Sequence, residues 1–310
     1  MRLGSRLLAE LQADLCELSF DREELRGPLS GVGATLDYRE IRPSPPLERH
    51  VRCFWMLRAP ATEGAPAQRV LPDGCVEMVI NLGAPFQRHD SSGITERQPR
   101  MLLVGPTTRH MSIAPTGAIR LVGIRFEPGG ALPFLAASPT ELRDAAPALE
   151  DAAVPLDRAL VNQLEEAPFG TEAGIVDAAL RRKLVGARRA DDLRVHACVR
   201  ATLAAREPMR VDALVTLTGL GARQLERRFR DTVGFGPKTL CRLVRFQRVV
   251  RAAGHFADPP WARIAAGSGY ADQSHMAREF REFAGTTLTN YLREIHPLSD
   301  RFHGTTEAIS

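Results

Sequence analysis

The last third of this 310-residue chain contains an internal repeat, which limits the folds that the chain can adopt. Phe229–Gly234 (FRDTVG) recurs as Phe280–Gly285 (FREFAG), and a further glycine precedes each copy, Gly219 by ten residues and Gly269 by eleven. Apolar residues at spacings of three and four follow both glycines, as they do in amphipathic helices. The pattern predicts two helix-turn-helix units about fifty residues apart.

The second helix of each unit is predicted to have one apolar and one polar face. The apolar stripes consist of Leu225, Phe229, Val233, Met276, Phe280 and Phe283. The opposite faces and their borders carry Arg223, Gln224, Arg227, Arg230, Ser274, His275, Arg278 and Arg281. Arginine pairs with guanine, and glutamine with adenine, through two hydrogen bonds in the major groove. A charged helix face is often merely solvated, but its occurrence in both units favours DNA binding.

Between the two units, Pro237–Ala253 predicts a single connecting helix of roughly 25 Å, with Pro237 suited to its first turn. A rod of this length would hold two reading helices about one DNA turn apart. It has no acidic residue, and its cations are Lys238, Arg242, Arg245, Arg248 and Arg251. Such cations suit phosphate contacts. The predicted phosphate-contacting residues are Arg230, Lys238, Arg242, Arg245 and Arg281.

The charge distribution agrees with a polyanion partner for the C-terminal part. Residues 193–310 contain 18 Lys and Arg against 11 Asp and Glu, a net charge of +7, whereas residues 1–192 contain 23 against 26, a net charge of −3. A basic part behind a slightly acidic one indicates that only one end of the chain binds nucleic acid.

The part that precedes the repeat reads as β-structure. Val76, Met78, Ile80 and Leu82 alternate with other residues as in a half-buried strand, and residues 119–126 form a second β-prone run. Clusters of proline and glycine punctuate these runs as turns do. We expect a small antiparallel barrel or sandwich, cupin-like in architecture.

From about residue 139 to 186 the pattern becomes helical. Leu156, Leu160 and Leu164 form a stripe that either covers the barrel or makes a dimer contact. The predicted organisation is an α+β chain of two domains. These are a β-rich regulatory domain over residues 1–186, a linker at 187–192, an all-α DNA-binding domain at 193–295 and a disordered tail at 296–310.

The most specific motif is Ile264–Phe280 (IAAGSGYADQSHMAREF). With Gly236-Pro237, Arg242, Arg245 and Phe246 of the connector, it resembles the DNA-binding domain of AraC/XylS-type transcription regulators. The resemblance covers about residues 193–293 and implies seven helices and double-stranded DNA as a partner. The base-reading residues that it implies are Arg223, Gln224, Arg227, Gln273, Ser274, His275 and Arg278. Gly221 departs from the pattern, because the family often has a serine N-cap there.

Two N-terminal segments, Leu71–Glu77 and Gly123–Gly130, resemble a poorly characterised β-rich domain that precedes this module in some regulators. The resemblance implies a regulatory or sensing role through a small-molecule effector or self-association, with no particular ligand. Asp73, Cys75 and Glu77 are the candidate polar groups of a ligand pocket. RNA polymerase is a further expected partner.

Several classes of protein are disfavoured. No apolar run reaches the roughly 18 residues of a membrane span, and the first thirty residues lack a signal peptide. The five cysteines, which are Cys16, Cys53, Cys75, Cys198 and Cys241, are scattered without a CxxC pair. This argues against disulfides and structural zinc and favours the cytoplasm.

A catalytic constellation is not evident either. His50, His89 and His110 are isolated in the sequence, so we expect no metal, cofactor or enzymatic activity. Two alternatives remain open. One is a DNA-linked alkyl-transfer or thiol enzyme that uses an N-terminal cysteine, and the other is an architectural DNA-binding protein without a signal.

Overall fold

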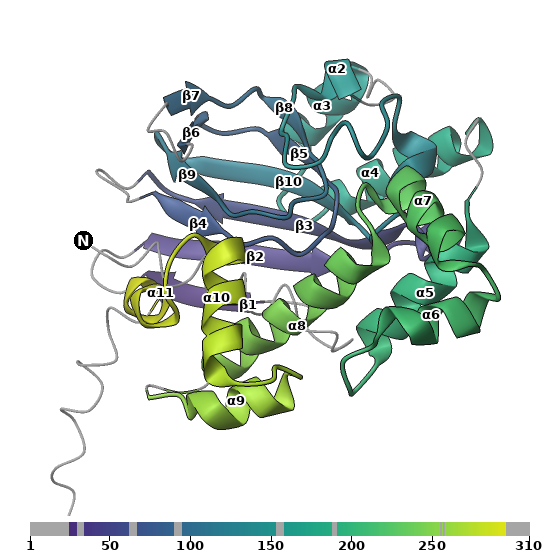
Figure 1. The fold of residues 1–310 in the computed structure, drawn as a ribbon. Coiled ribbons are helices and arrows are strands. Elements are labelled where there is room, and N and C mark those ends of the chain that lie inside the picture. The colour runs from purple at the N-terminus through teal and green to yellow at the C-terminus, as the bar shows by residue number, and fades with distance from the viewer. Residues whose placement is uncertain are drawn as a thin grey trace, which may run out of the picture.

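The computed structural model describes residues 25–29, 34–61, 67–89, 95–152, 158–187, 191–254, 256 and 258–295. In this part of the chain, two antiparallel sheets and three α-helices are followed by seven further α-helices (Figure 1). The predicted α+β fold class, with a β-rich part before an all-α part, is confirmed. Cys16, Leu156 and the tail at 296–310 lie outside the described residues.

The larger sheet has six strands in the order β1-β2-β3-β10-β5-β8. Their bounds are β1 (Leu25–Leu29), β2 (Ala34–Ile41), β3 (Val51–Ala59), β10 (Ile119–Phe126), β5 (Glu77–Asn81) and β8 (Met101–Val104). The smaller sheet has the order β4-β9-β6-β7, with β4 (Gln68–Val70), β9 (Met111–Pro115), β6 (Phe86–His89) and β7 (Thr95–Arg97). The strands predicted near residues 76–82 and 119–126 correspond to β5 and β10.

The larger sheet buries apolar side chains on both of its faces. One face shares a core with Leu160 and Leu164 of α3 (Arg158–Glu166) and with Val176 of α4 (Glu172–Val185). Two short 3-10 helices, η1 (Pro45–Leu47) and η2 (Leu132–Phe134), and α2 (Leu149–Ala152) complete that side. The other face packs against the smaller sheet, to which Phe86 belongs. The described part of the leucine stripe therefore packs on the sheet.

The C-terminal domain is built around a long central helix. Its helices are α5 (Leu193–Ala204), α6 (Val211–Thr218), α7 (Ala222–Val233), α8 (Pro237–Gly254), α9 (Trp261–Gly267), α10 (Gln273–Ala284) and α11 (Leu288–Ile295). α8 passes along the β-rich domain with α5–α7 near one end and α9–α11 near the other (Figure 1). α6 with α7 and α9 with α10 are the two predicted helix-turn-helix units, and α8 is the predicted connector. None of the described helices is long and apolar enough to cross a membrane.

Candidate nucleic-acid interface

We call α7 and α10, the second helices of the two units, the reading helices, because the sequence predicts that they contact DNA bases. In α7 the apolar and polar faces are separated as the sequence predicts. Leu225, Phe229 and Val233 are buried in the core of the helical domain. On the opposite side the base-reading candidates are exposed, and these are Arg223, Gln224 and Arg227. Gly221 stands at the N-cap and provides no side-chain hydrogen bond there, because it has no side chain.

The second reading helix, α10, repeats this arrangement. Its apolar stripe, which consists of Met276, Phe280 and Phe283, is buried. Gln273, Ser274 and Arg278 are exposed, as is the phosphate candidate Arg281. His275 is half-buried, with its ring edge-on to that of Tyr270 at 5.2 Å between centroids. Unlike α7, α10 has a side-chain cap, since Asp272 accepts a hydrogen bond from the His275 backbone N–H at 2.7 Å.

Four arginines on the reading helices have no side-chain partner among the residues that the structure describes. Within the described part of the chain, Arg223 and Arg227 on α7 and Arg278 and Arg281 on α10 form no ion pair or hydrogen bond through their side chains. Arg230 differs, since its guanidinium donates to Glu226 one turn earlier at 3.0 Å. An exposed cation without a protein partner needs no rearrangement before it meets a nucleic acid.

The connector's cations are mostly engaged within the protein. Arg245 donates to Glu279 of α10 at 2.8 Å and lies over the Tyr270 ring, 4.4 Å from its centroid. Arg242 donates to Glu279 at 2.7 Å and to Glu282 at 2.5 Å. The Tyr270 hydroxyl also donates to the Glu279 carboxylate, at 2.8 Å. These contacts join α8 to the second reading helix.

Glu279 is the centre of this network. It is only 5% exposed, so burial alone would raise its pKa, but hydrogen bonds from Arg242, Arg245 and Tyr270 lower the pKa of the carboxyl below its ordinary value. The sequence predicted Arg242 and Arg245 as phosphate contacts. The structure gives both guanidinium groups protein partners, and a phosphate contact stays a prediction. Lys238, by contrast, is exposed.

Glu279 was missed at the sequence level, because one glutamate in a charged helix carries no signal of burial. Only the spacing of Glu279 from Met276, three residues along the helix, could have placed Glu279 at the border of the buried stripe.

Arg248 of the connector is also engaged within the protein, since its guanidinium donates to the Ala205 carbonyl just past α5.

The candidate pocket groups of the N-terminal domain lie together around a buried arginine. Arg125 of β10 is 8% exposed, donates to Glu77 and lies 3.8 Å from Asp73. Asp73 also accepts a hydrogen bond from the Cys75 backbone N–H at 2.8 Å, as a turn-forming aspartate does. Burial raises the pKa of Glu77 and of the Cys75 thiol. A charged residue within the apolar run of β10 was the available signal for Arg125.

A second polar cluster joins the two domains at the linker. Asp191 lies 3.5 Å from His50 Nε2 of the N-terminal domain and 3.7 Å from His196 Nε2 of α5. Arg49 is 3.7 Å from the same carboxylate. Both histidines are buried, and His50 Nδ1 faces the Gly130 carbonyl at 3.2 Å. His50 is isolated in the sequence but has charged neighbours in the fold.

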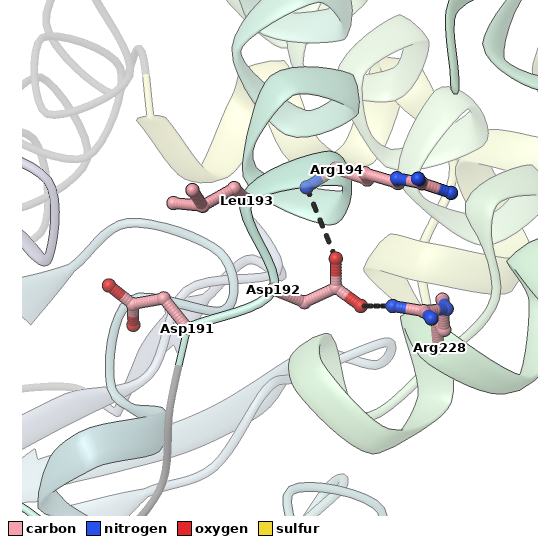
Figure 2. A pocket seen from close by; sticks show the side chains of 5 residues that line it. All are labelled: Asp191, Asp192, Leu193, Arg194 and Arg228. Atoms are coloured by element: carbon pink, nitrogen blue, oxygen red, sulfur yellow. Dashed lines mark hydrogen bonds and ion pairs between the residues drawn. The ribbon is translucent and has the colours of Figure 1, made fainter. Parts of the chain in front are cut away.

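Beside this cluster, an open depression of about 520 Å³ lies between the linker and α7. Its walls are Asp191, Asp192, Leu193, Arg194 and Arg228 (Figure 2). Asp192 caps α5 through the Arg194 N–H at 3.1 Å and binds Arg228 of α7 at 2.7 Å (Figure 2). Burial opposes ionisation of Asp192, but the hydrogen bond from Arg228 and the cap lower its pKa. The depression therefore marks a structural junction between linker and reading helix.

Comparison with known families covers both domains. A family model described as a helix-turn-helix domain matches residues 214–294, and a model described as a domain of unknown function matches residues 39–147. No curated protein matches the chain.

Solved structures with similarity to the chain include two of ToxT from Vibrio cholerae. One is 9% identical with a TM-score of 0.43 and covers 85% of this chain and 99% of that chain. The other, with bound unsaturated fatty acid, is 9% identical with a TM-score of 0.42 and covers 90% and 99%. A predicted oxalate decarboxylase from Thermotoga maritima is 15% identical with a TM-score of 0.23 and covers 34% and 91%. Similarities this weak do not bear on function.

The family matches agree with the geometry of the two units. Both reading helices lie within the matched segment, and the exposed cationic faces are those that the sequence motif implies. The chain therefore carries a C-terminal helix-turn-helix domain of the AraC type, the DNA-binding module of transcription regulators, behind an N-terminal domain from a family of unknown function.

Proposed function

We propose that the protein regulates transcription by reading two adjacent major-groove segments of a specific DNA site, one with α7 and one with α10. The proposal rests on the pair of exposed arginines on each reading helix, which lie opposite a buried apolar stripe and have no side-chain partner in the described part of the chain. Two such faces on one rigid connector suit two turns of one duplex better than two separate ligands.

The side chains divide into two groups by their place on the helices. In helix-turn-helix proteins the N-terminal residues of the reading helix contact base edges. Arg223, Gln224, Arg227, Gln273, Ser274, His275 and Arg278 form this base-reading group. Arg230, Arg281 and Lys238 lie nearer the helix ends and connector and would bind phosphate. Arg242 and Arg245 act first by positioning α10, through Glu279.

The N-terminal domain is proposed to modulate DNA binding, by a small-molecule effector or by self-association, and RNA polymerase is the expected partner at a promoter. Support comes from the packing of this domain on the helical one. Leu71 belongs to the apolar core of the C-terminal domain, and Gly74 packs against Phe235. A change within the β-rich domain thus has a direct route to the reading units.

Thiol chemistry gains no support from the four cysteines that the structure describes. Cys53 and Cys75 are buried, and burial raises the pKa of both thiols. Burial likewise raises the pKa of Cys198 to about 11 and that of Cys241 above its ordinary value. A nucleophilic cysteine needs a thiolate near neutral pH, which none of these four environments promotes.

The test is selection of bound fragments from random DNA with the full chain, followed by binding of variants to the selected and scrambled duplexes. Arg227→Ala and Arg278→Ala should each cost roughly 1–3 kcal/mol on the selected duplex and relax preference at one or two base pairs. Lys238→Ala should weaken both duplexes and reduce the salt slope by about one. Arg182→Ala, at an exposed site on α4, is the matched control. Equal loss on both duplexes for both reading variants would refute the assigned faces.

A further inference from the structure

The N-terminal domain contacts both reading helices in their last turns. The Thr140 hydroxyl donates to the Arg230 carbonyl in the last turn of α7 at 2.9 Å. The His110 backbone N–H donates to the Phe283 carbonyl in the last turn of α10, also at 2.9 Å. The Arg69 guanidinium donates to the neighbouring Ala284 carbonyl at 2.9 Å. Loops far apart in the N-terminal sequence thus meet the same end of both helices.

These contacts answer a general need of helix ends. The last four carbonyls of an α-helix have no partner within the helix, and a cation near them also interacts favourably with the helix dipole. Most helices satisfy these carbonyls with water or with their own chain. In α10, the His110 backbone N–H and the Arg69 guanidinium of the other domain supply donors to two such carbonyls. In α7, the Arg230 carbonyl already accepts a hydrogen bond from the Gly234 backbone N–H at 3.0 Å, and the Thr140 hydroxyl adds a second one. The N-terminal domain therefore completes the end of α10 and adds a contact to the end of α7.

The backbone that ends each helix is also in close contact with the N-terminal domain. Gly234 and Gly285 end α7 and α10 in the left-handed conformation, with φ of +94° and +65°. A Cβ at Gly234 would lie 2.6 Å from the Pro139 carbonyl oxygen, and one at Gly285 would clash with Cε1 of the His110 ring. Glycine at both positions serves the helix end and the domain contact together.

A third contact lies on the connector between the two units. Gln247 of α8 is buried and donates to the Pro72 carbonyl at 2.6 Å. On either side of Pro72, Leu71 enters the core of the helical domain and Gly74 packs against Phe235 and Leu243. With the two helix ends, this makes three points at which one domain spans both reading units.

The contacts leave the proposed reading surface open. They lie in the last turns of α7 and α10, whereas the base-reading residues begin at Arg223 and Gln273, in the first turns. Those side chains are exposed. The N-terminal domain, in contact with both helices, is therefore placed to position them for DNA and does not cover the surface that would bind DNA.

We infer that Thr140, Arg69 and Gln247 are positioning residues for DNA reading, because the N-terminal domain that they join to both units sets the distance and rotation between α7 and α10. The inference rests on the proposed function. The inference assigns to the β-rich domain control over the spacing between the two half-sites, which are the DNA segments read by α7 and by α10. A change that breaks these contacts should alter the preference for one half-site spacing over another, while the base contacts of each helix stay intact.

The test compares the full-length double variant Thr140→Val/Arg69→Met with wild type on duplexes that carry the selected half-sites at natural spacing or with one or two base pairs inserted. Each inserted base pair turns the second half-site by about 35°. Wild type should lose roughly tenfold to a hundredfold in affinity on insertion. The variant should lose only a few-fold, since its second unit can follow the displaced half-site.

The matched control is Thr116→Val/Arg88→Met. It removes the hydrogen bond from the Thr116 hydroxyl to the Pro85 carbonyl and the ion pair of Arg88 with Glu96, both within the N-terminal domain. It should keep the wild-type spacing profile, as should Thr140→Ser, which retains the hydroxyl. If the double variant does not fold, Thr140→Val alone, at an exposed side chain, carries the same comparison. A folded variant with the wild-type spacing profile would overturn the inference alone. A wild type with no sequence preference would overturn the proposed function and the inference with it.

Discussion

The two helix-turn-helix units have the same layout, yet different chemistry holds them in place. The second reading helix is capped by Asp272 and tied to the connector by Glu279, which binds two arginines and a tyrosine. The first has only Gly221 at its N-cap, and its Arg228 is bound by Asp192 of the linker.

The two units are therefore coupled to different parts of the molecule. Besides the N-terminal-domain contacts in its last turn, α10 is placed by the connector α8 of its own domain. Besides the Thr140 contact, α7 is placed by the linker, where Asp191 also meets His50 of the N-terminal domain. Changes at the linker should therefore affect the first unit more than the second, and changes at Glu279 should affect the second.

The largest effect is expected from Glu279→Gln. Without the carboxylate, the partly buried guanidinium groups of Arg242 and Arg245 lose their shared anion, and breaking a buried pair in this way costs about 3–5 kcal/mol of unfolding free energy. Urea unfolding of the full chain measures the loss. Glu282→Gln, at an exposed partner of Arg242, is the control and should cost less than about 1 kcal/mol. A Glu279→Gln protein as stable as this control would show that the network does not hold α10.

A smaller effect, on the first unit, is expected from Asp192→Ala. The change removes the cap of α5 and the ion pair to Arg228, which is 38% exposed and hence contributes little by itself. The total loss should be about 1–2 kcal/mol. Hydrogen exchange should quicken in α5 and α7 and stay unchanged in α10. Asp272→Ala is the mirror experiment, with faster exchange in α10, and the same exchange pattern in both variants would refute the separation of the units.

The smallest effect is a dependence of stability on pH that differs between α5, next to the linker, and α10. Burial lowers the pKa of His196 below its ordinary value of 6.5, an effect that His50 and Arg49 reinforce and that Asp191 opposes. The unfolded chain then binds the proton first, so the stability contributed by a neutral His196 is present above that value and is lost as pH falls below it. Glu279 has a lowered pKa, so its contribution is lost only at lower pH, below the ordinary carboxyl value of 4.5.

Hydrogen exchange between pH 7.5 and 5.5, corrected for the intrinsic pH dependence of exchange, measures this difference. The junction of α5 with the linker should loosen in that range, and α10 should not. His196→Phe should remove the dependence at the junction. A wild-type junction whose protection is constant across the range would contradict the assignment to His196.

Periodicity predicted β5, β10 and the two reading helices, because each of these elements buries apolar side chains at a regular spacing. α8 begins at Pro237 as predicted and ends at Gly254, one residue beyond the predicted end, and the apolar stripes of α7 and α10 are buried. The exposed faces followed from the same pattern. Local sequence was sufficient wherever a residue's environment depends on its neighbours along the helix.

Contacts between distant segments could not be predicted in this way. Arg242 and Glu279 are 37 residues apart, and the cations of α8 read in sequence as a surface for phosphate. Leu71 lies in the core of the other domain, and His50 meets Asp191 of the linker, a contact that the sequence around neither residue indicates. A buried ion pair and a domain contact both depend on tertiary packing, which no short pattern encodes.

Hydroxyl-radical footprinting of the full chain on its selected duplex tests whether one chain reads two adjacent major-groove segments with α7 and α10. We predict two protected segments on one face of the duplex, with centres about 10–10.5 base pairs apart. Arg227→Ala should weaken one segment and Arg278→Ala the other. A single protected segment, or equal weakening of both segments by each variant, would contradict the claim.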